Sequence, residues 1–313
     1  MNTHKYVSRL IAAALLFATT TAAQAITFTN VSGIIPFAGT SSYSATLTYQ
    51  GLVRNYIVIR PTKTSTTPAP AMFLLHPRDT DILPMANLSL AGRLAANYGT
   101  WVFIPQAYTG QWHDDPSPTG SQSTLPDDVG FLSALMDVAV KQNGIDAKRI
   151  YVAGYSNGGF MSQRLACELT SKIAGMGVVS AALRTPLAAS CRPTLALPVV
   201  IIPGTADPIV PYNGNSTTDS AAQTATFWLN NNRCIGAPSI TNYPKVSGDG
   251  TTVSLSRYGT CTTGSEVRVY TVQNGGHTWP GSPFTGMAMV GYTSRAIDAT
   301  MELWNVLSTY HLQ

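Results

Sequence analysis

The sequence has few charged side chains and no cluster of them. Charged residues make up 11% of the 313 residues, and the formal net charge of +4 is spread along the chain without a run of lysine or arginine. A protein that binds nucleic acid gathers its positive charge into a patch or stripe. The sequence therefore argues against nucleic-acid binding, and its polar but uncharged composition is typical of exported proteins.

Long hydrophobic runs are also missing. The apolar run at residues 10–17 is far shorter than the ~20 residues that a membrane-spanning helix needs, and no later segment is longer and equally apolar. This run follows a short positively charged stretch and precedes the small residues of Ala23-Gln24-Ala25, an order that is typical of a signal peptide. We therefore expect a signal peptide at residues 1–25, a secreted or periplasmic protein, and no stable insertion into a membrane.

Cysteine is scarce, and no Cys-x-x-Cys pair or clustered histidine accompanies it, which argues against a metal site. The four cysteines are Cys167, Cys191, Cys234 and Cys261. An even number in an exported chain favours disulfides, although four cysteines allow three pairings. Pairing in sequence order is the simplest of the three.

Strand-like and helix-like segments alternate along most of the chain. Residues 43–49 and 52–59 have β character, short buried-type strands are expected at 72–75, 101–104, 150–153, 178–179, 199–202 and 267–272, and helical spacing occurs at 83–98, 127–143, 157–169, 221–231 and 294–310. This alternation predicts an α/β fold with a mostly parallel central sheet and helices on both faces. Because no internal repeat or composition break is present, we expect residues 26–313 to form a single domain, with an irregular insert at 236–265.

A Gly-x-Ser-x-Gly pattern, Gly154-Tyr155-Ser156-Asn157-Gly158, lies between an expected strand and an expected helix. The pattern alone occurs by chance in chains rich in glycine and serine. In this strand–turn–helix context it predicts a nucleophile elbow, in which the serine projects above the sheet at the amino terminus of the helix. That terminus supplies free N–H groups and positive potential where an oxyanion would form. Ser156 is therefore the predicted nucleophile.

A serine nucleophile needs a base that takes its proton, and in this architecture the base follows the serine in the chain. His277 lies on a glycine-rich loop after an expected strand and is the predicted base. His76 and His113 precede Ser156, and His311 is expected on the surface near the carboxyl terminus.

The base in turn needs a carboxylate that orients it. Asp207 directly follows the expected strand at 199–202, where the acid belongs in the order serine, aspartate, histidine. An ordinary Asp-Pro turn is the alternative interpretation of Asp207, and Asp219 is a weaker alternative acid.

Four segments carry a resemblance to a known family: Asp127–Leu132, Gly154–Gly159, Gly204–Tyr212 and Gly276–Gly281. In these segments, which span most of the chain in order, the sequence resembles esterases of the polyhydroxybutyrate depolymerase and feruloyl esterase type, within the α/β-hydrolases. The resemblance implies the α/β-hydrolase fold and a triad of Ser156, Asp207 and His277, in agreement with the chain order.

The sequence departs from this family in the loop that supplies the oxyanion hole. One donor is expected to be the backbone N–H of Asn157, the residue after the nucleophile. The second comes from an earlier loop, where the family shows His-Gly but this chain has His76-Pro77-Arg78. Because proline has no N–H, we expect the backbone N–H of Arg78 to be the second donor. Arg78 and Asp79 either pair with each other or meet the substrate.

Aromatic residues near the motifs are candidates for the substrate pocket: Trp279, Trp112, Tyr155 and Tyr212. Packing in the core is the competing interpretation for each, and it is weakest for Trp279, which lies beside the predicted base. Phe160 and Met161, in the helix after the elbow, are expected in the core.

These features predict a secreted serine esterase that hydrolyses carboxylic esters through an acyl-enzyme, without cofactor or metal. The resemblance implies hydroxyalkanoate (polyhydroxybutyrate-type) oligomers or polyesters as substrates, followed closely by feruloyl or acetyl esters of plant polysaccharides. A serine peptidase shares the triad, and a non-catalytic binding protein on a hydrolase scaffold is the alternative from another class. The sequence does not indicate an oligomeric state.

Overall fold

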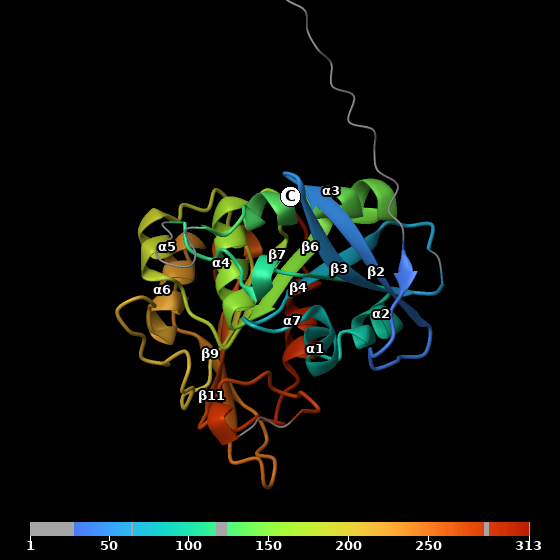
Figure 1. The fold of residues 1–313 in the computed structure, drawn as a ribbon. Helices are drawn as coiled ribbons and strands as arrows, with labels where there is room; N and C mark the ends of the chain where they lie inside the picture. The colour runs from blue at the N-terminus through green and yellow to red at the C-terminus, as the bar shows by residue number, and fades with distance from the viewer. Residues whose placement is uncertain (1–27, 64, 117–123, 285–287, 313) are drawn as a thin grey trace, which may run out of the picture.

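The computed structural model describes residues 28–63, 65–116, 124–284 and 288–312. The predicted signal peptide, residues 1–25, lies outside these ranges. Figure 1 shows a central twisted sheet that is covered by helices. No helix within the described ranges has the length and apolar character needed to cross a membrane.

Eleven strands among the described residues form one sheet in the order β1-β2-β3-β5-β4-β6-β7-β8-β11-β10-β9. Their bounds are β1 (Thr29–Asn30), β2 (Thr40–Tyr49), β3 (Leu52–Pro61), β4 (Ala69–Leu75), β5 (Trp101–Pro105), β6 (Ile145–Tyr155), β7 (Gly175–Val179), β8 (Val199–Ile202), β9 (Ser239–Asn242), β10 (Thr252–Tyr258) and β11 (Val267–Gln273). The central strands from β5 to β11 in this order are parallel. The strands beyond them on both sides pair antiparallel.

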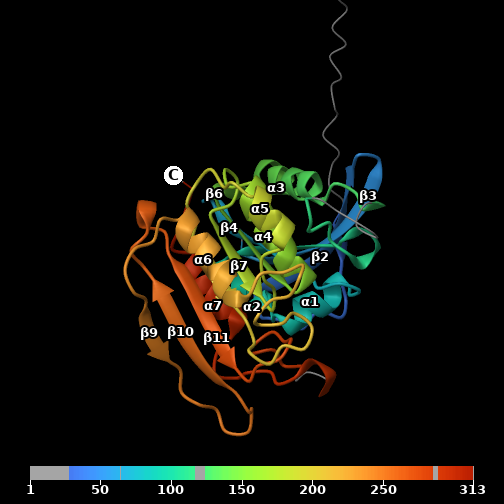
Figure 2. The same cartoon turned by 90° about the vertical axis from the view of Figure 1, so that its left-hand side faces the viewer.

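Helices cover both faces of the sheet, as Figures 1 and 2 show. One face packs against α1 (Ile82–Leu88), α2 (Gly92–Tyr98) and α7 (Ala299–Leu307), and the other against α3 (Asp128–Asn143), α4 (Asn157–Glu168), α5 (Thr185–Ser190) and α6 (Ala221–Asn231). Side chains of β4 alternate between the two layers, since Met72 and Leu74 face the first while Phe73 and Leu75 face the second. The prediction of a mostly parallel sheet with helices on both faces is confirmed.

One expected helix is divided, another begins later than expected, and α5 was not predicted. The helix expected at 83–98 is divided into α1 and α2, because Leu90 between them adopts a positive φ of 49° that no right-handed helix accommodates. The closing helix begins at Ala299 rather than 294, because the Asp298 side chain caps it by accepting a hydrogen bond from the backbone N–H of Met301 (3.2 Å).

The segment at 236–265 is not the irregular insert that we expected. It contains β9 and β10, which extend the sheet beyond β11 as an antiparallel edge. Val253 and Leu255 are buried while the residues between and beside them are more exposed, which is the alternation of a half-buried strand. The alternation involves few hydrophobic residues among many serines and threonines, so hydrophobicity alone did not reveal this strand.

Both disulfides pair the cysteines in sequence order. Cys167 at the end of α4 is bonded to Cys191, which directly follows α5. Cys234 after α6 is bonded to Cys261 in the loop before β11, so this bond closes the segment that carries β9 and β10.

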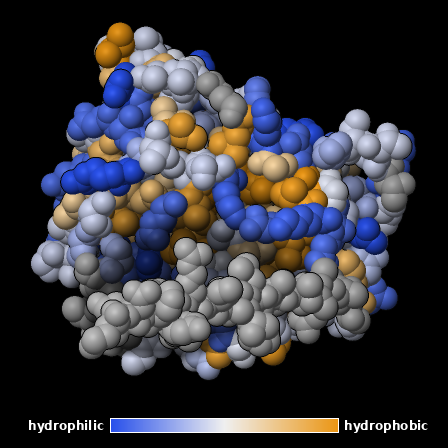
Figure 3. Space-filling model, turned by 90° about the horizontal axis from the view of Figure 1, so that it is seen from above, coloured by the Kyte–Doolittle hydropathy of each residue, from blue (hydrophilic) through white to orange (hydrophobic). Residues whose placement is uncertain are grey.

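The two ends of the parallel strands face opposite sides of the molecule. In Figure 2 the arrowhead of β11 points downward, so the carboxyl ends of the parallel strands lie at the lower side. Figure 3 views the molecule from above and therefore shows the opposite end, where hydrophobic residues lie toward the middle among hydrophilic ones. The loops that carry the predicted triad follow the carboxyl ends.

Candidate active site

Ser156 occupies a strained turn between β6 and α4. Its backbone has φ 54° and ψ −120°, a conformation that residues with a side chain rarely adopt. The glycines around it allow the close packing of this turn. A Cβ atom at Gly154 would meet the backbone of Gly158, and one at Gly158 would meet the carbonyl of Leu75 at the end of β4. The local geometry is that of the nucleophile elbow predicted from the sequence.

A cavity of about 310 Å³ lies directly beside this turn. It is lined by Ser156 and Asn157 from the elbow, Arg78 from the loop after β4, Phe160 and Arg184, and Ile209, Val210, Asn215, Thr217 and Thr218 from the loop after β8. Asn157 is the first residue of α4, so its backbone N–H has no partner within the helix and lies at the positive end of the helix dipole.

Asp207 and His277 form a buried hydrogen-bonded pair. Oδ2 of Asp207 lies 2.8 Å from Nδ1 of His277, and Oδ1 accepts the backbone N–H groups of Ile209 and Val210, both at 2.8 Å. Since a carboxylate only accepts hydrogen bonds, Nδ1 of His277 is the donor in this pair and Nε2 is left as the basic nitrogen. Asp219, the alternative acid, instead accepts from the Thr185 hydroxyl (3.3 Å).

The imidazole of His277 lies against the residue that precedes Ser156. The ring of Tyr155 is 5.2 Å from the imidazole between centroids, and its hydroxyl donates to the carbonyl oxygen of His277 (2.6 Å). Burial raises the pKa of Tyr155, so this hydroxyl keeps its proton and remains a donor. A Cβ atom at Gly276 would meet the carbonyl of Val290, so glycine is required where the His277 loop passes this neighbouring segment.

The loop with the Pro77 departure is held by the buried side chain of His76. Its Nε2 accepts the backbone N–H of Ala107 (2.9 Å), so Nδ1 carries the proton and donates to the carbonyl oxygen of Pro77 (2.7 Å). Burial lowers the pKa of His76 to about 4, so the ring is neutral at ordinary pH. The residue before Arg78 is thus fixed from inside the protein.

Trp112 links this loop to the elbow. Its indole Nε1–H donates to the carbonyl oxygen of His76 (3.0 Å), and its backbone N–H donates to Oδ1 of Asn157 (2.7 Å). The amide Nδ2 of Asn157 in turn donates to Oδ2 of Asp114 (2.6 Å). The side chain of Asn157 therefore anchors the segment that supports the loop of Arg78.

The structure gives each of the four aromatic residues expected to contact substrate a partner or a place within the protein. Trp112 is fully buried and serves as the link just described, and Trp279 is 3% exposed in the core with its indole N–H donating to the Thr300 hydroxyl (3.1 Å). Tyr155 contacts His277 rather than the cavity, and Tyr212 lines only a small recess of about 10 Å³ near Asp207. None of these four rings is among the described residues that line the cavity beside Ser156, and their contact with substrate stays a prediction.

The sequence analysis missed two contributors to the cavity wall. One is Arg184, which had no motif to mark it, and the other is the loop at 209–218, whose start was visible only as the residues after Asp207. Phe160, which we expected in the core, is buried, and it also lines the cavity. Met161 is fully buried, as expected.

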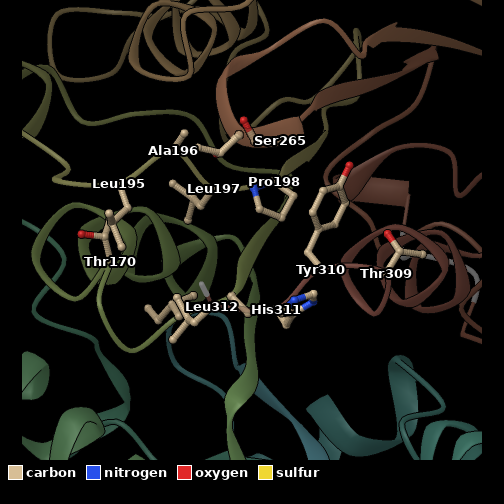
Figure 4. A pocket seen from close by; sticks show the side chains of 13 residues that line it. Thr170, Leu195, Ala196, Leu197, Pro198, Ser265, Thr309, Tyr310, His311 and Leu312 are labelled. Atoms are coloured by element: carbon tan, nitrogen blue, oxygen red, sulfur yellow. The ribbon is translucent and has the colours of Figure 1, made fainter.

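The last histidine of the chain lies apart from this site. His311 lines a second cavity of about 180 Å³, with Leu197, Tyr310 and other residues that are labelled in Figure 4. That cavity adjoins Ala174 and Pro198, which precede β7 and β8, so it lies at the end of the sheet opposite Ser156. Within the described ranges, no group of three or more His, Cys, Asp and Glu residues is arranged to hold a metal ion.

Comparison with known proteins finds similarity to esterases over part of the chain. Residues 105–235 match the phospholipase/carboxylesterase family. The putative esterase NocK of Nocardia uniformis subsp. tsuyamanensis is 33% identical over 206 residues, which cover 60% of this chain and 59% of NocK. Feruloyl esterase B of Piromyces equi is 28% identical over 224 residues, which cover 67% of this chain and 39% of that enzyme.

A solved structure supports the fold. A thermostable esterase superposes with a TM-score of 0.57 over 86% of this chain and 62% of its own, at 13% sequence identity. The α/β-hydrolase fold also agrees with the strand order of the sheet and with the strained turn at Ser156. The sequence relatives agree with it as well. The chain has the fold of the α/β-hydrolases and is similar to esterases over part of its length.

Proposed function

We propose that the protein is a serine esterase that hydrolyses carboxylic esters through a covalent acyl-enzyme. The observation that carries the proposal is the strained turn at Ser156, which opens onto a cavity of about 310 Å³. Tyr155, the residue before Ser156, contacts His277, which forms a buried pair with Asp207. The esterase relatives support it, although the chain spans only about three fifths of NocK and two fifths of the feruloyl esterase.

In the proposed mechanism, Oγ of Ser156 attacks the ester carbonyl while Nε2 of His277 takes its proton. The Asp207 carboxylate holds the imidazole in the tautomer with Nδ1–H and stabilises the imidazolium that forms. The tetrahedral intermediate collapses as the imidazolium returns the proton to the leaving alcohol. Water then attacks the acyl-enzyme with His277 again as the base, which releases the acid and restores Ser156.

The proposed oxyanion hole consists of the backbone N–H groups of Asn157 and Arg78. Both residues line the cavity together with Ser156, and Pro77 does not remove the donor because the N–H in question belongs to the next residue. The buried bonds of His76 and Trp112 give this loop a fixed position, which a donor needs in order to stabilise charge without reorganising.

The proposed substrates are those named from the sequence. The four motif segments favour hydroxyalkanoate oligomers or polyesters, and the feruloyl esterase of Piromyces equi favours esters of plant polysaccharides. Export across a membrane fits both, because polymers do not enter cells, and the two disulfides fit an oxidising compartment.

Hydrolysis of 4-nitrophenyl butyrate by the wild type and by Ser156→Ala tests the proposal. We expect the substitution to remove turnover by a factor on the order of 10⁶ in kcat, because the acyl-enzyme can no longer form. Circular dichroism of the variant provides the control for folding. Equal inactivity of both proteins would support the non-catalytic alternative, and hydrolysis of a 4-nitroanilide in preference to the ester would support a peptidase.

A further inference from the structure

Two arginines and no acidic residue are found among the described residues that line the cavity beside Ser156. Arg184 contributes from the start of α5, and Arg78 contributes from the loop after β4. The remaining wall is apolar or carries neutral hydroxyl and amide groups, such as those of Thr217 and Asn215. A neutral ester needs no positive charge in its binding cavity, so the charge requires another explanation.

The side chain of Arg184 is held in a defined orientation. Its guanidinium stacks 4.3 Å above the ring of Phe160, and its Nη2 donates to Oδ2 of Asp114 (3.1 Å). Asp114 is fully buried and does not line the cavity, so this ion pair presents its positive end to the cavity.

The pairing with Asp114 does not use all the donors of Arg184. The same Oδ2 atom of Asp114 also accepts the Asn157 amide (2.6 Å). Nε of Arg184 is buried without a hydrogen-bond partner, so Nη1, which no described residue engages, is the donor left for a ligand. An arginine can donate five hydrogen bonds in a planar fork that matches a carboxylate. Arg184 therefore keeps the capacity to bind a second acceptor.

Arg78 adds an unbalanced positive charge at the same cavity. Its side chain is exposed, and no ion pair joins it to Asp79 or to another described carboxylate. With the charge of Arg184 offset by Asp114, the cavity carries about one net positive charge, near a helix amino terminus that has the same sign.

From these contacts we infer that Arg184 and Arg78 bind a carboxylate of the substrate, so that the site selects esters that carry a free carboxylate a few bonds from the ester group. This inference rests on the proposed ester hydrolysis. The substrate class is a half-ester of a dicarboxylic acid or an ester of a hydroxy acid with a free carboxyl end, and hydrolysis itself follows the steps given above.

The kinetic test uses pairs of substrates that differ only in charge. Monomethyl glutarate is compared with the ester in which a neutral amide replaces its carboxylate, which places the charge on the acyl side. Acetoxyacetate is compared with acetoxyacetamide, which places it on the alcohol side. We expect kcat/KM for the charged member of at least one pair to be about tenfold higher or more in the wild type, with a preference that declines as salt is added.

Charge variants assign that preference to the two arginines. Arg184→Gln and Arg78→Gln should each reduce the ratio of charged to neutral kcat/KM several-fold, whereas Arg184→Lys and Arg78→Lys should retain part of it. Arg192→Gln removes an equal charge from an exposed residue that does not line the cavity and should leave the ratio unchanged. Because Arg184→Gln removes the ion pair with the buried Asp114 and can unfold the protein, Arg78→Gln carries the test independently.

Binding to Ser156→Ala, measured by calorimetry, separates this inference from the proposed function. Tighter binding of the charged member of a pair supports the carboxylate site even if no ester is turned over, in which case only the esterase proposal fails. Equal kcat/KM and equal binding for both members of both pairs overturn the carboxylate site, while turnover of the neutral esters leaves the esterase proposal standing. A ratio that Arg78→Gln and Arg184→Gln leave unchanged also overturns it.

Discussion

The two sides of the candidate active site are built by different means. On the acid–base side, main-chain groups hold the reactive side chains: two backbone N–H groups fix Asp207, and the loop of His277 is packed through Gly276 against the neighbouring backbone. On the oxyanion side, buried side chains hold a backbone, because His76 and Trp112 fix the loop that leads to Arg78.

The two sides of the site are therefore sensitive to different substitutions. On the acid–base side, a substitution of a reactive residue removes chemistry directly and leaves the scaffold intact. On the oxyanion side, the proposed donors are backbone groups that no substitution deletes, so only loss of a supporting side chain can weaken them.

Among substitutions that compare the two sides, replacing the acid should give the largest effect. Asp207→Asn keeps the size of the side chain but removes the carboxylate that selects the Nδ1–H tautomer of His277, so we expect kcat to fall by about 10⁴-fold. Stopped assays with 4-nitrophenyl butyrate measure this loss. The matched control is Asp219→Asn, since Asp219 contacts the Thr185 hydroxyl and should retain nearly full activity. A larger loss for Asp219→Asn would transfer the role of acid to that residue.

The buried His76 on the oxyanion side should make stability depend on pH. Its pKa is lowered from 6.5 to about 4 by burial, so between these values the unfolded chain binds a proton that the folded chain does not. The free energy of unfolding therefore falls as the pH drops from 6.5 toward 4, and at 1.36 kcal/mol per pKa unit the total loss is roughly 3 kcal/mol. The contribution of the neutral His76 ring to stability is fully retained above about pH 6.5.

Urea titrations between pH 4 and pH 7 measure this slope. His76→Gln should remove roughly 3 kcal/mol of the pH dependence, whatever its effect on stability at neutral pH. His311→Gln, at an exposed histidine, should leave the slope of the wild type unchanged. If the free energy of unfolding of His76→Gln changes with pH as in the wild type, then a neutral His76 ring does not hold the loop.

The contrast also explains what the sequence could and could not predict. The pairing of Asp207 with His277 could be predicted because the acid–base side depends on glycines and on chain order, both of which are visible in the sequence. The elbow at Ser156 was visible for the same reason, and so was the alternation of strands and helices that defines the fold.

The oxyanion side was harder to predict from the sequence, because the side chains that support it contact residues that are distant in the chain. Trp112 was expected to contact substrate, yet its indole donates to a residue 36 positions earlier in the chain. Arg184 meets Asp114 over 70 positions, and neither residue belongs to a motif. A tryptophan near an active site carries the same sequence signal whether it faces the substrate or supports a loop.

The smallest of these effects is expected for Trp112→Phe, which keeps an aromatic ring and removes only the indole N–H. The carbonyl oxygen of His76 then loses its buried donor, at a cost of about 1–3 kcal/mol. Because this carbonyl lies in the loop that supplies the proposed second oxyanion donor, we expect kcat to fall about tenfold with little change in KM. Steady-state kinetics and thermal unfolding of the same sample measure the two effects.

Trp228→Phe provides the matched control for this substitution. Trp228 is also fully buried, and its indole N–H donates to the Gln163 side chain (3.0 Å), away from the residues that line the cavity. We expect a similar decrease in melting temperature but no change in kcat. If both variants lose stability and both keep full kcat, then Trp112 only supports the fold, and the loop of Arg78 does not depend on buried side chains for its catalytic position.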